Sequence, residues 1–414
     1  MILSTESIPF IKELKKTANV LNASIFVVGG TVRDLILNKN IHDIDVVIFN
    51  VSYTIFAEKL KQTLKAHLIN FKDNARLIKN HIIVDISKPR GNSILEDLNL
   101  RDFTINSMAL SLEGNLINFT DDLKNRCINL QYNNAFIDDP LRMLRAFRLA
   151  SELDFYITED IIKKIHKYKK YILSVARERI YEELYKTAIA KHFKNIYPLF
   201  IESQLFNTIF NLCTDEISTK FLNISLNNYY YHNYNNYSEN IHFIHMMILF
   251  VMYQYLYGDN NHNSDILNNL KKIIIVKNQC LYVSKILHLM DILLHTKVNK
   301  NILKHIVFNN LTYMPDIIIF FNILTISGFD NTKKTEVIYN MSKALYNSLK
   351  IDRLNEITGI DIKKAGVPEG LLFGKLLKRA QYYMVTDKCS TKEEALQRIK
   401  KLWGKLHEIS EIQN

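Results

Sequence analysis

The segment "VVGGTVRDLILNKNIHDIDVVI", residues 27–48, predicts the start of a fold that mixes strands and helices. The apolar run at 24–30 predicts a buried strand that ends in two glycines, 31–38 predicts a short helix, and 43–49 predicts a second strand. Gly29 and Gly30 let the backbone approach a ligand, free N–H groups at the helix start attract phosphate, and Arg33 adds a fork of donors. Taken alone, two glycines after a strand are more often an ordinary tight turn. With Arg33 they predict a phosphate-binding turn.

Two carboxylates, Asp43 and Asp45, stand at alternate positions of the second predicted strand, so they share one face. Their like charges repel, and a bound cation is the usual relief. Carboxylate oxygens suit Mg²⁺, and two such ions could activate an attacking hydroxyl and neutralise a leaving pyrophosphate. A solvated edge-strand face would be the better interpretation of Asp-x-Asp alone. Because Asp43 and Asp45 follow "GGTVRD" after a short separation in the sequence, we favour a catalytic pair of metal ligands.

Further candidates follow along the chain. Asp85 in "IIVDIS" is either a third catalytic carboxylate beside the metal or a surface residue. In "LEDLNLRDFTINSMAL" (95–110), Arg101 is a candidate for triphosphate binding. Asp102 is a candidate for holding Arg101 or a ribose hydroxyl.

The segment "FIDDPLRMLRAFRLASELDF" (136–155) carries Arg142, Arg145 and Arg148, one arginine every three residues. Apolar residues between them predict a packed helix with a slowly drifting ridge of cations. Packed arginines need acceptors, and Asp138 and Asp139 cannot serve all three. The shortage of acceptors predicts an anionic ligand. The alternative is a salt-bridged structural ridge.

The pattern along the chain predicts an α+β head followed by helices. Strand-like runs continue at 75–80, 81–87, 105–111 and 115–119, and helical periodicity prevails from Asp138 onward. The net charge of +11 is uneven, at +2 for 1–137 and +9 for the rest. Such a basic helical part is typical of polyanion binding, although a solvated lysine-rich surface would give the same charge.

Composition narrows the class of protein. The chain has 414 residues and is 48% hydrophobic, enough for two or more domains. Its four cysteines (127, 213, 280 and 389) are far apart and form no zinc or disulfide pattern, which fits a reducing cytosol. The start "MILSTESIPFIKELKK" does not resemble a signal peptide. The apolar windows 241–257 and 314–329 are short and contain polar residues, so we expect buried helices rather than membrane spans.

Four segments together resemble the class II tRNA nucleotidyltransferase and bacterial poly(A) polymerase family. They are "VVGGTVRDLILNKNIHDIDVVI", "LRDFTINSMA", "FIDDPLRMLRAFRLASELDF" and "ARERIYEEL", and they cover about residues 20–185. "AGVPEGLLFGKLLKRAQ" and "STKEEALQRIKKLW" near the end look like the tail of CCA-adding members. Where a second arginine is common in the family, this chain has Leu100, so triphosphate affinity is weaker or is supplied elsewhere.

The resemblance implies a polymerase-β-like nucleotidyltransferase head with a mixed β-sheet (1–137), then an all-helical neck (138–205), body (206–300) and tail (301–414). It implies Mg²⁺ at Asp43 and Asp45, and tRNA, CTP and ATP as partners. We expect a cytoplasmic protein without membrane contact; the sequence leaves the oligomeric state open, with a monomer favoured. The positions that match nucleotide contacts are Gly30, Arg33, Arg101, Asp139, Arg142, Arg145 and Arg148.

The resemblance also gives the arginine ridge a chemical role. Asp139 accepts and Arg142 donates, so the pair could imitate a Watson–Crick edge that admits cytosine and adenine and repels the carbonyl oxygens of guanine and uracil. We therefore expect a template-independent CCA-adding enzyme. A poly(A) polymerase, or a member that adds only CC or only A, is the alternative. A non-catalytic RNA-binding protein and a small-molecule nucleotidyltransferase are less favoured.

Overall fold

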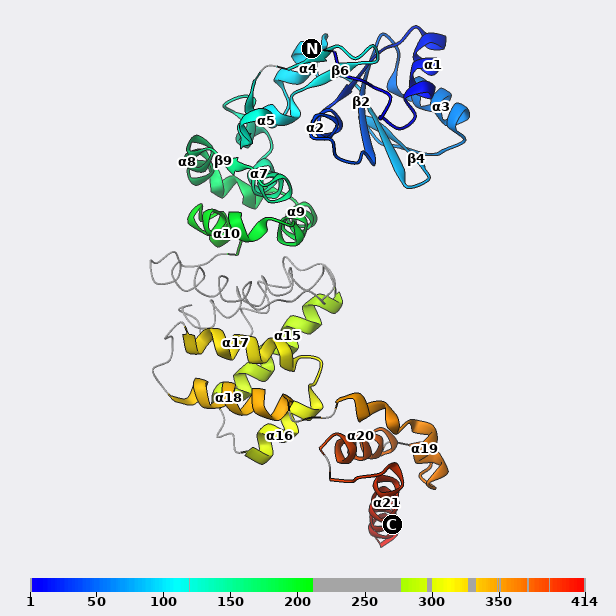
Figure 1. The fold of residues 1–414 in the computed structure, drawn as a ribbon, viewed down its shortest axis with the longest axis vertical. Coiled ribbons are helices and arrows are strands. Elements are labelled where there is room, and N and C mark those ends of the chain that lie inside the picture. The colour runs from blue at the N-terminus through cyan, green and yellow to red at the C-terminus, as the bar shows by residue number, and fades with distance from the viewer. Residues whose placement is uncertain are drawn as a thin grey trace. The chain divides into compact units, whose positions relative to one another are not determined.

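The computed structural model describes residues 2–118, 120–210, 277–295, 300–326, 333–347, 349, 351–370, 372–386 and 388–412 (Figure 1). The described residues up to 210 belong to one compact unit, and those from 277 onward belong to a second.

The first unit opens with a seven-stranded sheet in the order β3-β4-β5-β2-β1-β6-β7. Only the pair β2–β5 is parallel, and all other neighbours are antiparallel. The predicted mixed sheet is therefore confirmed. Its strands are β1 (Ser24–Val28), β2 (Asp43–Phe49), β3 (His67–Asn70), β4 (Asn74–Lys79), β5 (Ile82–Ser87), β6 (Ala109–Ser111) and β7 (Leu116–Ile117).

Alternation along β2 decides which side chains can face a ligand. Ile44 and Val46 are fully buried on one face, so Asp43, Asp45 and Val47 share the other. On that other face Val47 packs in a cluster with residues of β1, β6 and α4 (Ile94–Asn99). Helix α4 thus covers the Val47 end of the face and leaves the aspartate end accessible.

Two helices close the opposite side of the head. Helices α1 (Ile11–Leu21) and α3 (Tyr53–Leu64) pack against each other, and α3 also contacts β3 and β4 (Figure 1). Phe56 and Leu60, one helical turn apart on α3, are fully buried. Each Å² of apolar surface that such side chains bury contributes about 25 cal/mol to folding. Their burial therefore stabilises the layer that carries β2.

The strand boundaries agree closely with the sequence pattern, since β2 begins and ends as predicted. The sequence did not reveal β3, because its side chains are largely exposed and show no apolar alternation.

The chain then continues through a helical neck. Helix α7 (Arg142–Leu153) packs against α9 (Arg177–Ile189) and α10 (Phe193–Glu202). Phe147 of α7 meets Phe200 of α10 with ring centroids 4.8 Å apart. Two short strands, β8 (Cys127–Ile128) and β9 (Tyr156–Ile157), pair in parallel and so connect the end of the head with the neck. The helical pattern did not predict them. The other elements are α2 (Gly30–Ile36), α5 (Asp122–Asn125), α6 (Ala135–Asp138), α8 (Glu159–Tyr168) and α11 (Leu205–Phe210).

The described residues of the second unit are helical, as expected. Ile362, Leu376, Ala380, Met384 and Ile399 belong to one of its cores. Its helices are α15 (Lys277–His295), α16 (Lys300–Asn309), α17 (Met314–Ile326), α18 (Lys333–Asn347), α19 (Gly359–Lys364), α20 (Phe373–Val385) and α21 (Lys392–Ile412).

Two expectations from composition can be compared with the described residues of both units. No helix within the described ranges is long and apolar enough to cross a membrane. The apolar window 241–257 lies outside those ranges. The three cysteines that the structure describes, Cys127, Cys280 and Cys389, are free thiols.

Candidate active site

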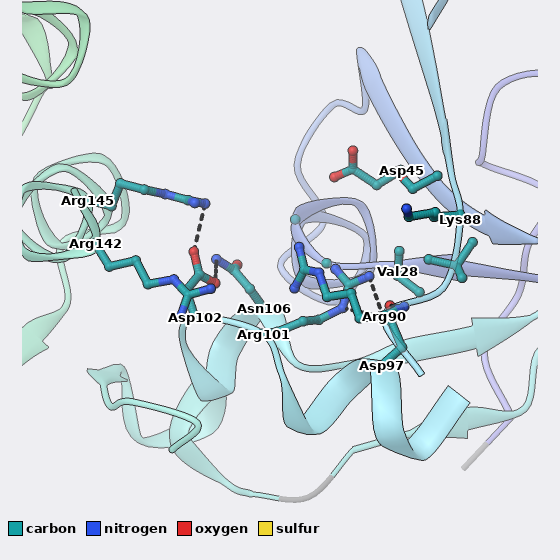
Figure 2. A pocket seen from close by; sticks show the side chains of 14 residues that line it. Val28, Asp45, Lys88, Arg90, Asp97, Arg101, Asp102, Asn106, Arg142 and Arg145 are labelled. Carbon is teal, nitrogen blue, oxygen red and sulfur yellow. Dashed lines mark hydrogen bonds and ion pairs between the residues drawn. The ribbon is translucent and has the colours of Figure 1, made fainter. Parts of the chain in front are cut away.

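A polar cavity of about 240 Å³ opens beside the aspartate end of β2. Seven predicted site residues line it, namely Gly29, Gly30, Asp45, Arg101, Asp102, Arg142 and Arg145. The remaining lining residues are Val28, Val47, Ser87, Lys88, Arg90, Asp97 and Asn106. Figure 2 shows the head arginines Arg90 and Arg101 near the centre of this site, with Arg142 and Arg145 to one side and Asp45 to the other.

The spacing of the two aspartates is fixed by one hydroxyl group. Thr31, buried in α2, donates its hydroxyl to the carbonyl of Asp43 (3.1 Å) and accepts the N–H of Asp45 (2.8 Å). The side-chain carboxylates of both aspartates accept no hydrogen bond within the described part of the chain. Four carboxylate oxygens therefore remain available for a ligand.

Electrostatics make Asp45 an unfavourable site for a lone negative charge. Burial, followed by the nearby carboxylates of Asp85 and Asp43, raises the pKa of Asp45 from 3.8 to about 6, although Arg101 and Arg33 act in the opposite direction. A cation bound between the carboxylates would relieve this cost.

The donor set of Asp43 and Asp45 fits a divalent cation. Two hard carboxylates that have no side-chain hydrogen bond or ion pair among the described residues lie on one strand face. Mg²⁺ commonly takes one or two carboxylates and completes its shell with water and substrate phosphate. Among the described residues, no group of three His, Cys, Asp or Glu side chains forms a fuller cage. The two aspartates would therefore depend on phosphate oxygens for the remaining ligands.

Asp85 lies next to Asp45 in the parallel register of β5 and β2, as a third catalytic carboxylate would. However, Arg76 of β4 binds it through two bonds of 2.8 Å, Nε to Oδ1 and Nη2 to Oδ2. Because this fork occupies both oxygens of Asp85, a metal ion would compete with Arg76 for them.

The glycine turn allows two charged groups to meet over the backbone. Gly29 has φ +68°, a conformation that favours glycine. A Cβ atom there would lie 3.1 Å from Arg101 Nη1 and 3.5 Å from Asp45 Oδ2. Helix α2, which follows, has only seven residues, so the charge for binding phosphate must come mainly from arginines.

Asp97 is the buried anchor of the phosphate side of the cavity. Its Oδ2 accepts Arg101 Nε (2.9 Å) and Nη2 (2.7 Å), and its Oδ1 accepts the backbone N–H of Arg90 (3.0 Å). Only 1% of its surface is exposed. One carboxylate therefore positions both Arg101 and the loop that carries Arg90.

Arg33 does not line the cavity. Its guanidinium group donates to Asn106 (2.7 Å) and, through Nε and Nη2, to Asp34 (2.9 and 3.1 Å). It lies over Gly30, where a Cβ atom would be 3.4 Å from Nη2. In this arrangement Arg33 braces the glycine turn, and its predicted phosphate contact remains a prediction.

Asp102 and Arg145 connect the head with the neck. Arg145 Nη2 lies 2.7 Å from Asp102 Oδ2 in an ion pair that lacks hydrogen-bond geometry at that oxygen. Burial alone would raise the pKa of Asp102, but Arg145 and the N–H of Phe103 outweigh it and hold the pKa below 3.8. Asp102 thus holds Arg145 rather than Arg101, which the sequence suggested as its partner.

The predicted Asp139–Arg142 pair is not joined through its side chains. Arg142 Nη1 donates to the Tyr132 hydroxyl (2.6 Å) and to the carbonyl of Ala135 (3.2 Å), whereas Asp139 Oδ2 accepts Arg179 Nη2 (3.1 Å). Arg142 lines the cavity and Asp139 does not. The base-reading role of the two residues therefore remains a prediction.

Arg148 lies outside the cavity. It donates to Glu183 (2.7 Å) and to Glu152 (3.0 Å), and so joins α7 to α9. Burial would lower the pKa of Arg148, but these two carboxylates raise it above its usual range. In this arrangement Arg148 fixes the packing of α7 on α9, and its predicted nucleotide contact remains a prediction. The ridge as a whole finds more acceptors in the protein than the sequence suggested.

Sequence reasoning missed four residues of this region, namely Thr31, Arg90, Asp97 and Asn106. Thr31 and Asn106 lay within quoted motifs, but short polar residues at a turn are common and gave no distinct signal. Asp97 could have been noticed as an acidic residue one helical turn before Arg101, the spacing of an i,i+4 pair. Arg90 stands alone in a loop and offered no pattern.

Comparisons with known proteins agree with this geometry. Residues 25–129 match the poly(A) polymerase head domain, and residues 154–216 match the probable RNA- and SrmB-binding site of polymerase A. The chain is 35% identical over 188 residues to a CC-adding tRNA nucleotidyltransferase of Halalkalibacterium halodurans, covering 44% of this chain and 48% of that protein. It is 31% identical over 224 residues to a CCA-adding enzyme of Enterococcus faecalis, covering 49% and 53%. The match thus spans about half the length of these relatives.

Similarity of fold extends further along the chain. A Thermotoga maritima CCA-adding enzyme, solved in complex with tRNA, superposes with a TM-score of 0.69 at 22% identity, covering 96% of this chain and 95% of that one. A CCA-adding enzyme solved with CTP gives a TM-score of 0.65 at 21% identity, covering 96% and 94%. In its head and in the segment 154–216, the chain is similar to tRNA nucleotidyltransferases and poly(A) polymerases.

Proposed function

We propose that the protein is a Mg²⁺-dependent, template-independent CCA-adding tRNA nucleotidyltransferase of the cytoplasm. It would add C, C and A to the tRNA 3′ end from CTP and ATP. The observation that carries this proposal is the juxtaposition of two unpaired carboxylates, Asp43 and Asp45, with an arginine-lined cavity. That combination suits a triphosphate held beside a divalent cation.

In the proposed reaction, the terminal 3′-hydroxyl oxygen of the tRNA attacks the α-phosphorus of the nucleotide. The bond from that phosphorus to the β-phosphate oxygen breaks, pyrophosphate leaves, and the hydroxyl proton passes to solvent. A bound Mg²⁺ would lower the pKa of the attacking hydroxyl and neutralise charge on the phosphates.

The residues of the chain supply position and charge. Arg101, fixed by Asp97 and lying over Gly29, presents its remaining donors to the phosphate groups. Asp139 and Arg142 would read the base edge, once a nucleotide draws them from their present partners Arg179 and Tyr132. Arg145 holds the neck against the head through Asp102.

A member that adds only CC is the second candidate, because the relative from Halalkalibacterium halodurans bears that name. The deciding experiment incubates the full chain with tRNA that lacks its 3′ CCA and with tRNA that ends in CC. Each NTP is offered singly, and CTP and ATP are offered together.

A CCA-adding enzyme extends the first tRNA by two residues with CTP alone and by three with CTP and ATP, and adds one A to the second. A CC-adding enzyme extends the first tRNA by two residues whenever CTP is present and leaves the second tRNA unchanged. Long ATP-only extension of unrelated RNA would identify a poly(A) polymerase. No transfer to any RNA would contradict the proposal.

A further inference from the structure

The charges around the cavity do not balance among the described residues. Asp97 compensates Arg101, and Asp102 compensates Arg145. Lys88 also lines the cavity, but its ammonium group pairs with Asp73. Arg142 has a hydroxyl and a carbonyl as partners, and Arg90 has no carboxylate within ion-pair distance in the described part of the chain.

Arg90 is held in place through its backbone while its side chain stays available. Its N–H donates to the buried Asp97, the same carboxylate that fixes Arg101. The contact of its guanidinium group is a donation from Nη1 to the carbonyl of Leu100 at 3.4 Å, which is long for a hydrogen bond. Most of the five donors of this arginine are therefore unused.

The loop that carries Arg90 is well ordered by short-range bonds. Glu96 accepts the N–H of Asn92 at 2.7 Å, and Ser93 caps α4 by accepting the N–H of Glu96 at 3.2 Å. A cation on a loop fixed from both sides loses little conformational entropy when it binds a ligand.

Arg90 and Arg101 repel each other electrostatically, and Asp97 pairs with the guanidinium group of Arg101 but accepts the backbone N–H of Arg90. Burial and the proximity of Arg101 lower the pKa of Arg90, yet an arginine remains charged at neutral pH. An anionic group that bridges Arg90 and Arg101 would remove this repulsion and satisfy their free donors.

We propose that Arg90 binds the polyphosphate of the nucleotide beside Arg101 and acts as a second arginine of the phosphate site. This inference rests on the proposed function. The neighbouring Leu100 cannot serve, because its side chain is apolar, is 45% exposed and does not line the cavity. Arg90 thus supplies, from the loop after β5, the charge that the helix end lacks.

The test compares Arg90→Gln and Arg90→Lys with the parent, using the full chain without tRNA. Arg126→Gln is the matched control, since Arg126 is also exposed in the first unit but does not line the cavity. Calorimetry measures the affinities for CTP, ATP, inorganic tripolyphosphate and CMP.

Arg90→Gln should weaken CTP, ATP and tripolyphosphate alike, by about tenfold to a hundredfold, the range of a hydrogen bond to a charged group. CMP, which lacks the outer phosphates, should bind as it does to the parent. Arg90→Lys, which keeps a charge without the planar fork, should lie in between. Arg126→Gln should match the parent throughout.

Parental affinity of Arg90→Gln for CTP and tripolyphosphate would overturn the inference, as would an equal loss for CMP. A role limited to capping α4 would lower the unfolding temperature without changing the ratio of triphosphate to monophosphate affinity. The tRNA extension assay of the parent tests the proposed function separately. If the parent binds triphosphates through Arg90 but extends no tRNA, the proposed function is contradicted and the role of Arg90 in phosphate binding is not.

Discussion

Arg145 of the neck and Asp102 of the head form an ion pair with 2.7 Å between Nη2 and Oδ2. Asp102 is buried, and about a third of the Arg145 side chain remains exposed. This contact links the helix that would read the base to the segment that would hold the phosphates, so its strength should matter for both stability and transfer.

Replacing Asp102 by Asn should lower the free energy of unfolding at neutral pH by about 1–3 kcal/mol, because Arg145 loses its counter-charge in a partly buried site. The folded-state pKa of Asp102 is depressed, so its contribution is fully present above the ordinary pKa near 3.8 and is lost as pH falls through the lower folded value. Urea unfolding from neutral pH to about pH 2 should therefore show a smaller acid loss for Asp102→Asn than for the parent. Glu58→Gln, which breaks an exposed pair with Lys61, should leave both stability and its pH dependence nearly unchanged.

Asp45→Asn should abolish transfer and yet make the protein more stable without divalent cations. A pKa raised from 3.8 to about 6 means that ionised Asp45 costs folding energy above that pH. The gain should reach about 1–3 kcal/mol at neutral pH and vanish below about pH 4, where both states are protonated. Thermal unfolding in EDTA measures it, with the exposed Asp121→Asn as control. A destabilised Asp45→Asn variant would contradict the electrostatic account of this site.

Arg148 should prove structural. Arg148→Met leaves Glu183 without its 2.7 Å partner, so the neck should lose stability while the preference among NTPs stays constant. A double-mutant cycle with Glu183→Gln should give a coupling energy of about 1–3 kcal/mol. Changed nucleotide preference in the folded Arg148→Met protein would instead return this arginine to the substrate site.

Asp139→Ala should reduce discrimination more than triphosphate binding. Each lost base-edge contact is worth about 1–3 kcal/mol, and the carboxylate also repels the carbonyl oxygens of uracil and guanine. Incorporation of all four NTPs into tRNA lacking CCA should become less selective for Asp139→Ala and for Arg142→Ala. Arg33→Ala should weaken all four nucleotides alike. If Asp139→Ala slows transfer but leaves its selectivity unchanged, Asp139 has a structural role through its ion pair with Arg179 and does not read the base.

The basic C-terminal part should contribute a salt-dependent share of tRNA affinity. Lys375 and Lys378 of α20 are exposed and line a groove together with Arg379 and Tyr382. Lys375→Gln with Lys378→Gln should reduce the slope of log affinity against log salt by about one for each lost phosphate contact. Lys12→Gln with Lys16→Gln, on the exposed side of α1, should leave that slope unchanged. Equal slopes for the two double variants would contradict tRNA binding at this groove.

Local patterns predicted β1, β2, β4 and β5 and the shared face of Asp43 and Asp45, because alternation along β2 is a property of seven consecutive residues. The partners of the arginines could not be predicted in the same way. Asp102 precedes Arg145 by 43 residues and Glu183 follows Arg148 by 35, so only the packed fold brings these acceptors to the ridge. Arg90 is a similar case, since its position depends on a buried carboxylate of the following helix.

The hydroxyl of Thr31 has a consequence for how the two aspartates meet a cation. Because it joins the carbonyl of Asp43 to the N–H of Asp45, the backbone geometry of the pair is preorganised before any ligand arrives. A metal ion then spends little of its binding energy on ordering the chain. Valine has nearly the same shape as threonine but cannot make these bonds, so the Thr31→Val variant would keep the fold and carry a looser, weaker metal site. The two proposed metal ligands would thus depend on a residue that is not itself proposed to bind the nucleotide or the metal.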